Sequence, residues 1–156
     1  MKSMHSLDDI DRRILSELQA DAGISNGDLA ERVGSSTASV WRRIKAMEAS
    51  GLLRQSVRLL DQHTLGYGVN VLCNIRVRSH ARDVRNAFET FVGERPEILE
   101  CFSMSGDWDY LLRIVAADVS GYERFLMHTL LEHPSVGGAS SHFALSLTKY
   151  TTALPL

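Results

Sequence analysis

The sequence predicts an α+β protein, with an N-terminal three-helix (winged) helix-turn-helix domain and a C-terminal ferredoxin-like domain of order βαββαβ. Two observations carry this prediction. In the first fifty or so residues, apolar side chains recur every three to four positions, as they do along amphipathic helices. From about residue 67, apolar and polar residues alternate in short runs typical of half-buried strands. We therefore expect domains at residues 1–52 and 67–156, joined by a connector or strand at 53–66.

The first predicted helix lies in the segment LDDIDRRILSELQ. Ile10, Ile14 and Leu18 are spaced four residues apart and fall on one stripe of a helix. Asp8 is placed to accept hydrogen bonds from the free N–H groups of the first turn, with Asp11 in the capping-box position three residues later. The spacing predicts a capped, amphipathic helix with one buried face.

The second and third predicted helices meet at Gly34. Glycine ends a helix readily because it adopts the left-handed backbone conformation, and either Ser35 or Ser36 can cap the helix that follows. Small Ala30 precedes the glycine where two helices would approach closely, and Val40 follows as an aliphatic core residue. This layout is typical of a helix-turn-helix.

The C-terminal segment reads as strand, helix, strand, strand, helix, strand. The predicted elements are a strand at 69–77, a helix at 81–92, strands at 97–105 and 110–116 joined by the turn 106–109, a helix at 120–131 and a strand at 141–150. Ser120 and Glu123 would form a capping box for the second of these helices. Phe143, Leu145 and Leu147 would share one face of the last strand.

Composition narrows the classes of function. No apolar run approaches the roughly 20 residues of a membrane span, and the N-terminus lacks the apolar core of a signal peptide, so we expect a cytoplasmic protein without a membrane partner. Cys73 and Cys101 are too few for a disulfide framework and are expected to be buried free thiols. The six histidines lack metal-site spacing, so we expect no metal and no cofactor.

Positive charge gathers on the third helix in a chain whose formal net charge is -2. Residues 41–58 hold five basic residues against Glu48 alone, which makes a local charge of +4. Such a helix is either an ordinary solvated face or a surface for a polyanion. In a helix-turn-helix the second helix enters the major groove of double-stranded DNA, with its N-terminal residues on base edges. We therefore expect DNA contacts from Ser36, Thr37, Ala38, Ser39, Trp41, Arg42, Arg43, Lys45 and Arg54.

Two of these residues have alternative roles. Arg43 could instead pair with Glu48 or with an acidic group of the first helix. Trp41 could pack on sugars and thymine methyls, or it could cover the junction with the first helix. Arg42 is placed to reach bases or phosphate, while Lys45 and Arg54 are better placed for phosphate.

Several segments in one order resemble the Lrp/AsnC, or feast/famine, transcriptional regulators across nearly the whole chain. These segments are LDDIDRRILSELQADAGISNGDLAERVGSS, RRIKAMEASGLL, PEILECFSMSGDWDYLLRIVAAD, YERFL and KYTTALPL. The resemblance implies a DNA-binding regulator whose C-terminal domain senses a small molecule, commonly an amino acid. It also implies a homo-oligomer built from dimers, commonly an octamer. The turn GSSTAS and the presence of Trp41 depart from the family pattern and leave the preferred DNA sequence open.

The resemblance places the effector at the turn MSGDWD. Asp107 or Asp109 could accept hydrogen bonds from an amino acid's ammonium, and the N–H groups of Ser105 and Gly106 could bind its carboxylate. Its side chain would lie against Met104 or a neighbouring subunit. Glycine and aspartate are also ordinary residues of a tight hairpin turn. Ser140 and His142 on the last strand are weaker candidates.

Two other classes of protein compete with a ligand-responsive regulator. Some proteins that resemble this family are tetrapyrrole decarboxylases, and the paired carboxylates of Asp107 and Asp109 suggest acid–base chemistry. An enzyme would leave the basic third helix without a role. The third class is a ligand-sensing assembly module with a vestigial DNA-binding domain.

Overall fold

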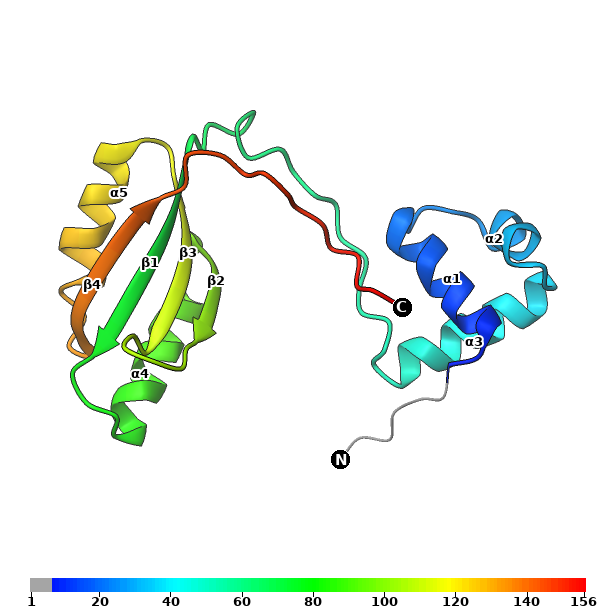
Figure 1. Ribbon diagram of the computed structural model, residues 1–156, viewed down its shortest axis with the longest axis horizontal. Helices are drawn as coiled ribbons and strands as arrows, with labels where there is room; N and C mark the ends of the chain where they lie inside the picture. The colour runs from blue at the N-terminus through cyan, green and yellow to red at the C-terminus, as the bar shows by residue number, and fades with distance from the viewer. Residues whose placement is uncertain (1–6) are drawn as a thin grey trace. The chain divides into compact units, whose positions relative to one another are not determined.

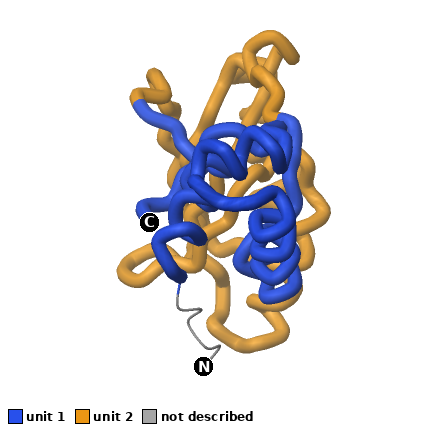
Figure 2. The backbone as a smooth tube through the Cα atoms, turned by 90° about the vertical axis from the view of Figure 1, so that its right-hand side faces the viewer, with its two compact units in different colours: residues 1–58, 149–156 blue, residues 59–148 orange. Residues whose placement is uncertain are grey.

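The computed structural model describes residues 7–156, so the first six residues of the predicted 1–52 domain lie outside the described part. The chain forms two compact units (Figure 2). One contains the residues up to Arg58 together with Lys149–Leu156, and the other is Leu59–Thr148. The predicted C-terminal domain extends to residue 156, whereas the final segment clusters with the helical unit. There the Gln19 side-chain amide donates to the Leu154 carbonyl (3.0 Å) and accepts from the Leu154 N–H (2.6 Å).

The helical unit contains α1 (Asp9–Ala20), α2 (Asn26–Val33) and α3 (Thr37–Ala49), shown in Figure 1. The predicted capping box is confirmed, because the Asp8 carboxylate accepts from the Asp11 N–H and the Asp11 carboxylate accepts from the Asp8 N–H. Ser25 caps α2 by accepting from the Asp28 N–H. These caps satisfy N–H groups that no helix can pair internally.

The turn between α2 and α3 is formed as the sequence predicts. Gly34 adopts a left-handed conformation (φ 70°, ψ 46°), and Ser36 rather than Ser35 caps α3 by accepting from the Ser39 N–H. Ala30 and Val40 are buried where the two helices meet. The core of this unit consists of Ile14, Leu15, Leu29, Ala30, Val33, Val40 and Met47.

The connector after α3 forms no strand in the part of the chain that the structure describes. Gly51 has a φ of 78° and ends α3 as expected. Within the predicted 53–66 connector, a turn begins at Asp61, whose carboxylate accepts from the Thr64 N–H (2.7 Å). The segment that would form the wing after α3 is therefore irregular and is not a β-ribbon.

The second unit has the predicted βαββαβ order. It contains β1 (Val69–Val77), α4 (Arg82–Gly93), β2 (Ile98–Ser103), β3 (Tyr110–Ala116), α5 (Val119–Phe125), the π-helical turn η1 (Leu126–Leu130) and β4 (Val136–Phe143). The sheet has the order β2-β3-β1-β4 and every pairing is antiparallel. The helices α4 and α5 cover one face and leave the other open (Figure 1). Alternate residues of the strands, such as Cys73, Ile75 and Leu112, fill the core beneath those helices.

The last strand is the element that the sequence placed wrongly. We expected 141–150, but β4 ends at Phe143, and Leu145 and Leu147 are 99% and 67% exposed. The strand β1 pairs with β4 from Val71↔Phe143 to Val77↔Val136. The Ala144 N–H donates to the Asn70 carbonyl (2.9 Å) at the end of this ladder, and the residues beyond pair with no strand of the described chain.

Two smaller expectations also change. The helix α5 begins one residue earlier than predicted, because the Asp118 carboxylate accepts from the Gly121 N–H (2.6 Å) and caps it in place of Ser120. Cys73 is buried as predicted, but Cys101 is exposed on β2. That strand lies at the edge of the sheet, where one side has no neighbouring strand.

Adjacent glycines of β4 should respond differently to the same substitution. A Cβ on Gly137 would lie 3.3 Å from the backbone of Arg76, Val77 and Arg78, whereas a Cβ on Gly138 would meet nothing within 4 Å. We expect Gly137→Ala to lower the free energy of unfolding of this unit by about 1–3 kcal/mol. Gly138→Ala should be neutral or stabilising by up to about 1 kcal/mol. Urea denaturation followed by Trp108 fluorescence, in a Trp41→Phe background, measures both, and equal effects would contradict the close approach.

Candidate DNA-binding surface and effector site

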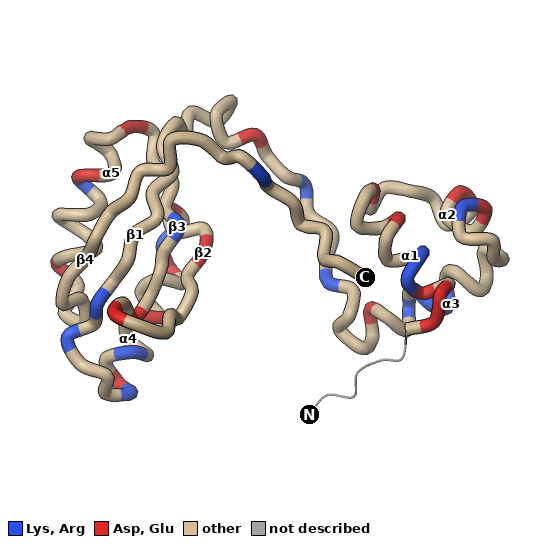
Figure 3. Tube along the Cα trace, viewed as in Figure 1, with Lys and Arg blue, Asp and Glu red and all other residues tan. Residues whose placement is uncertain are grey.

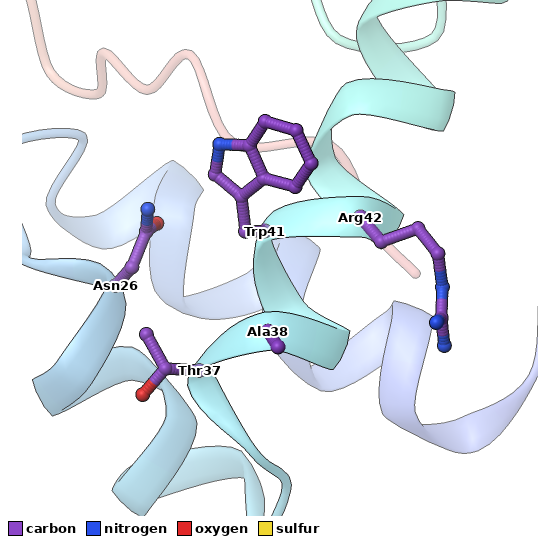
Figure 4. Close-up of a pocket in the computed structure, with 5 residues that line it drawn as sticks. All are labelled: Asn26, Thr37, Ala38, Trp41 and Arg42. Carbon is purple, nitrogen blue, oxygen red and sulfur yellow. The ribbon is translucent and has the colours of Figure 1, made fainter.

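The N-terminal turns of α3 present an exposed surface beside the start of α2. Thr37, Ala38, Trp41 and Arg42 are exposed on α3, while Val40 on the opposite side is fully buried. Together with Asn26 these four residues line a shallow hollow (Figure 4). Asn26 was not predicted from sequence, because nothing local distinguishes the first residue of α2 from any polar helix start.

Arg43 points away from this surface and holds α3 to the start of α1. Its guanidinium lies 2.7 Å from both the Asp8 and the Asp11 carboxylates. Hydrogen bonds to Asp11 and Asp8 raise the pKa of Arg43. The Asp11 N–H, followed by the Arg43 side chain, lowers the pKa of Asp8 below its ordinary value of 3.8. Of the two roles considered for Arg43, the geometry supports the ion pair with helix one.

The remaining cations of the predicted DNA-binding set are exposed. Lys45 forms a surface pair with Glu48 (2.7 Å), and such pairs contribute little and exchange easily. Within residues 7–156, neither Arg42 nor Arg54 forms an ion pair. Figure 3 shows acidic and basic positions together where α1 and α3 meet, and basic positions along the segment that follows α3. Ser36 caps the helix, and Ser39 is half-buried behind it.

The turn between β2 and β3 is braced from β1 by a residue that sequence reasoning missed. The Arg76 guanidinium donates twice to the Asp107 carbonyl (2.9 and 3.3 Å) and lies 4.9 Å from the centre of the Trp108 ring. The Met104 N–H donates to the Asp109 carbonyl (2.8 Å) and closes the turn, with Gly106 at a φ of 114°. Arg76 is separated from the turn by a whole helix and strand, so no local pattern connects them.

The two aspartates of the turn differ in what they already bind. One Asp109 carboxylate oxygen accepts from the Val77 N–H (2.8 Å), and the other lies 3.5 Å from the His80 ring. The Asp107 side chain is exposed, and within residues 7–156 only its backbone carbonyl forms a hydrogen bond. Asp109 is therefore part of the turn's own structure, while the Asp107 carboxylate is available.

Ser140 and His142 lie on β4, on the open face of the sheet. They pair with Asn74 and Leu72 of β1, and the Ser140 hydroxyl lies 3.3 Å from His142 Nε2. Arg76, which braces the turn, pairs with Gly138 of β4. Ser140 therefore lies nearer to Arg76 along the strand than His142 does. The exposed Met104 and Ser105 complete the predicted effector set on the turn itself.

Among residues 7–156, no group of three or more His, Cys, Asp or Glu side chains could hold a metal ion. No described helix has both the length and the apolar character to cross a bilayer.

Comparison with known proteins covers both units. Residues 7–54 match the winged helix-turn-helix DNA-binding family, and residues 70–154 match the Lrp/AsnC ligand binding domain. The transcriptional activator DecR of Escherichia coli is 37% identical over 96% of this chain and 99% of its own length. The leucine-responsive regulatory protein of Escherichia coli is 38% identical over 95% of this chain and 90% of its own.

A solved structure shows the same arrangement of elements. A transcriptional regulator from Neisseria meningitidis, solved as its L-Met complex, has a TM-score of 0.92 and 37% identity over 96% of this chain and 97% of that one.

A helix-turn-helix unit joined to a ligand-binding α+β unit defines a DNA-binding transcriptional regulator. The chain belongs to the Lrp/AsnC family. The relatives matched over nearly their whole length are transcriptional regulators and not enzymes, so the comparisons contradict the rival interpretation as a tetrapyrrole decarboxylase.

Removing Arg43 should destabilise the helical unit in a pH-dependent way. The folded pKa of Asp8 lies below its ordinary value, so the stabilisation it provides is present above pH 3.8 and is lost as the pH falls through the folded pKa. We expect Arg43→Met to lower the melting temperature by roughly 2–5 °C at pH 7. Part of the acid dependence should remain, because the Asp11 N–H still bonds Asp8.

Thermal melting between pH 3 and 7 measures this effect. Arg42→Met is the matched control, because it removes the same charge from an exposed position without an ion pair among the described residues. A melting temperature that falls equally in both variants would contradict the structural role of Arg43.

Proposed function

We propose that this regulator binds specific sites on double-stranded DNA by inserting α3 into the major groove, and that an amino acid bound at the β2–β3 turn changes its DNA affinity. The observation that carries the proposal is the exposed N-terminal face of α3, held by a core on its other side. Val40 and Met47 bury that other side, and Arg43 fixes it to α1. A fixed helix presenting Thr37, Ala38, Trp41 and Arg42 can read base edges in a defined register.

The residues of this surface divide by chemistry. Arg42, Lys45 and Arg54 carry positive charge that attracts the phosphate backbone and supplies affinity for any sequence. Thr37, Ala38, Ser39 and Trp41 lie nearer the start of α3, where base edges are read, and Ser36 precedes them with a hydroxyl that can donate to phosphate. Arg43 contributes by holding the helix.

The salt dependence of DNA binding tests whether the helix-turn-helix is functional. A dimer that contacts six phosphates should give a slope near −5 in a plot of log affinity against log salt concentration. We expect Arg42→Met to lower the magnitude of the slope by about 1 for each phosphate that the arginine neutralises. Fluorescence anisotropy with a fluorescent duplex at 50–300 mM salt measures the slope.

Arg124→Met is the control for this measurement, because Arg124 is exposed on α5 in the other unit. A slope near zero for the unsubstituted protein would mean that the DNA-binding domain is vestigial and would overturn the proposal.

An amino acid matches the polar groups of the turn. The free Asp107 carboxylate can accept hydrogen bonds from an ammonium, and the exposed Ser105 and Gly106 offer N–H groups to a carboxylate. The Met104 side chain is 42% exposed and offers apolar surface. Support comes from the Neisseria meningitidis regulator, which was solved as an L-Met complex. Ser140 and His142 remain weaker candidates for contact with the effector.

Self-association completes the proposal. On the open face of the sheet, Leu72 and Phe102 are 41% and 51% exposed, and exposed apolar patches of this kind mark interaction surfaces. We infer at least a homodimer through this face and further assembly of dimers, with an octamer as the expected size. An effector at an interface between dimers would shift that assembly or the spacing of the α3 helices. Such a regulator acts in the cytoplasm, where its DNA is.

Thermal melting against each of the twenty amino acids at millimolar concentration identifies the effector. A ligand at about 100 times its Kd adds roughly 2.7 kcal/mol to stability, which raises the melting temperature clearly. We expect Asp107→Asn to abolish the shift and Asp109→Asn to retain most of it, because an asparagine oxygen still accepts from the Val77 N–H. Sedimentation velocity with and without the effector should show a changed assembly or shape.

If Asp107→Asn keeps the full shift in melting temperature, the effector's ammonium does not bind the Asp107 carboxylate. An unchanged sedimentation profile would exclude the assembly mechanism. If no amino acid shifts the melting temperature, the effector belongs to another chemical class.

A further inference from the structure

Trp41 exposes an apolar surface on the part of α3 that we propose faces DNA. Its side chain is 54% exposed, although Val40, Ile44 and Met47 already supply the helix's buried stripe. Neither the core of the helical unit nor the partly buried side chains packed against it include Trp41, which disfavours a role in covering the junction with α1. A large aromatic surface that the fold does not bury is available to a partner.

The hollow beside Trp41 is lined mainly by carbon. Figure 4 shows the indole ring on one side of it, with Asn26 at one edge and Arg42 at the other. Ala38 adds a methyl group, and Thr37 turns its methyl toward Asn26 and its hydroxyl away. The polar groups of Asn26 and Arg42 therefore lie at the rim, and the centre is apolar.

Among the groups that distinguish the base pairs in the major groove, the C5-methyl of thymine is the apolar one. The edges of guanine, cytosine and adenine present hydrogen-bond donors and acceptors, while thymine adds a C5-methyl group. Threonine, alanine and aromatic side chains are residues that contact this methyl. A ring and two methyl groups on the first turns of a recognition helix match it in both chemistry and position.

We propose that the hollow formed by Trp41, Thr37 and Ala38 binds the C5-methyl of a thymine in the operator, which makes Trp41 a specificity-determining residue. The inference rests on the proposed DNA-binding function. The rim residues Asn26 and Arg42 then hydrogen-bond the flanking phosphates or the neighbouring base edge. If Trp41 instead packs against sugars, its contribution to affinity would not depend on the DNA sequence.

Replacing thymine by deoxyuridine tests the proposal directly, because it removes the methyl and leaves the base-pairing edge unchanged. A high-affinity site is first selected from random duplexes with the full chain. Each thymine is then replaced singly, and Kd is measured by anisotropy. We expect one position in each half-site to lose about fourfold in affinity, the effect of one buried methyl, while the other positions change little.

Substitution at Trp41 supplies the second half of the test. In Trp41→Ala the thymine and deoxyuridine duplexes should bind equally at that position, and Trp41→Phe should retain part of the difference. Arg42→Met should weaken both duplexes and keep the difference, because Arg42 lies at the rim. Thermal melting checks folding, which an exposed side chain should affect little.

The outcomes separate this inference from the proposed function. Absence of salt-dependent DNA binding would overturn the proposed function itself. Salt-dependent binding with no methyl-sensitive thymine, or with a methyl effect that persists in Trp41→Ala, would overturn the thymine pocket alone. If Trp41→Ala weakens binding of the thymine and deoxyuridine duplexes equally, so that the ratio of their Kd values is unchanged, the ring contacts sugars. That result would also overturn the thymine pocket.

Discussion

The left-handed backbone at Gly34 is the constraint on which the proposed DNA-binding surface depends. At a φ of 70° it ends α2, and the next N–H, from Ser35, donates to the Ala30 carbonyl (2.9 Å). The chain then enters α3 almost at once, so the rotation of α3 about its axis is set by this turn and by the burial of Val40 in the core that also contains Ala30. With Val40 fixed inward, helical geometry alone places Ala38 and Trp41 outward. The outward face of α3, which we propose meets DNA, is thus a consequence of packing on the opposite side.

Neighbouring arginines of α3 show how one short helix serves both packing and recognition. Successive residues of a helix are about 100° apart, so Arg42 faces outward while Arg43 reaches the Asp8 and Asp11 carboxylates. A count of charges along the sequence is therefore larger than the unpaired positive charge that α3 and the segment after it can offer to DNA. The local charge of +4 includes Arg43, which is neutralised by two partners, and Lys45, which is paired with Glu48. Arg42, Arg54 and Arg58 carry the charge that is free within the described chain.

Structural elements that depend on residues close together in the sequence could be predicted. Elements and contacts that depend on pairing between residues far apart in the sequence could not. The capping box of α1, the Gly34 turn and β3 at Tyr110–Ala116 all depend on local patterns and were predicted correctly. The predicted position of β4 was wrong because its glycine- and serine-rich residues show no apolar alternation, while the alternating residues after Phe143 pair with no strand among the described residues. The same limit applies to the sites. The ion pairs of Arg43 and the bonds of Arg76 to the turn join residues about thirty positions apart.

The chain's connectivity restricts how an effector could alter DNA binding. Leu59–Thr148 is joined to the helical unit at both ends, by the connector after α3 and by the tail after β4. The tail is attached to α1 through the two hydrogen bonds between Gln19 and Leu154, each worth about 1 kcal/mol at most on an exposed surface. Typical allosteric coupling is about 1–3 kcal/mol, so the attachment can carry only part of a strong response. The remainder has to come from the connector or from the assembly of subunits, where each copy adds its own contribution.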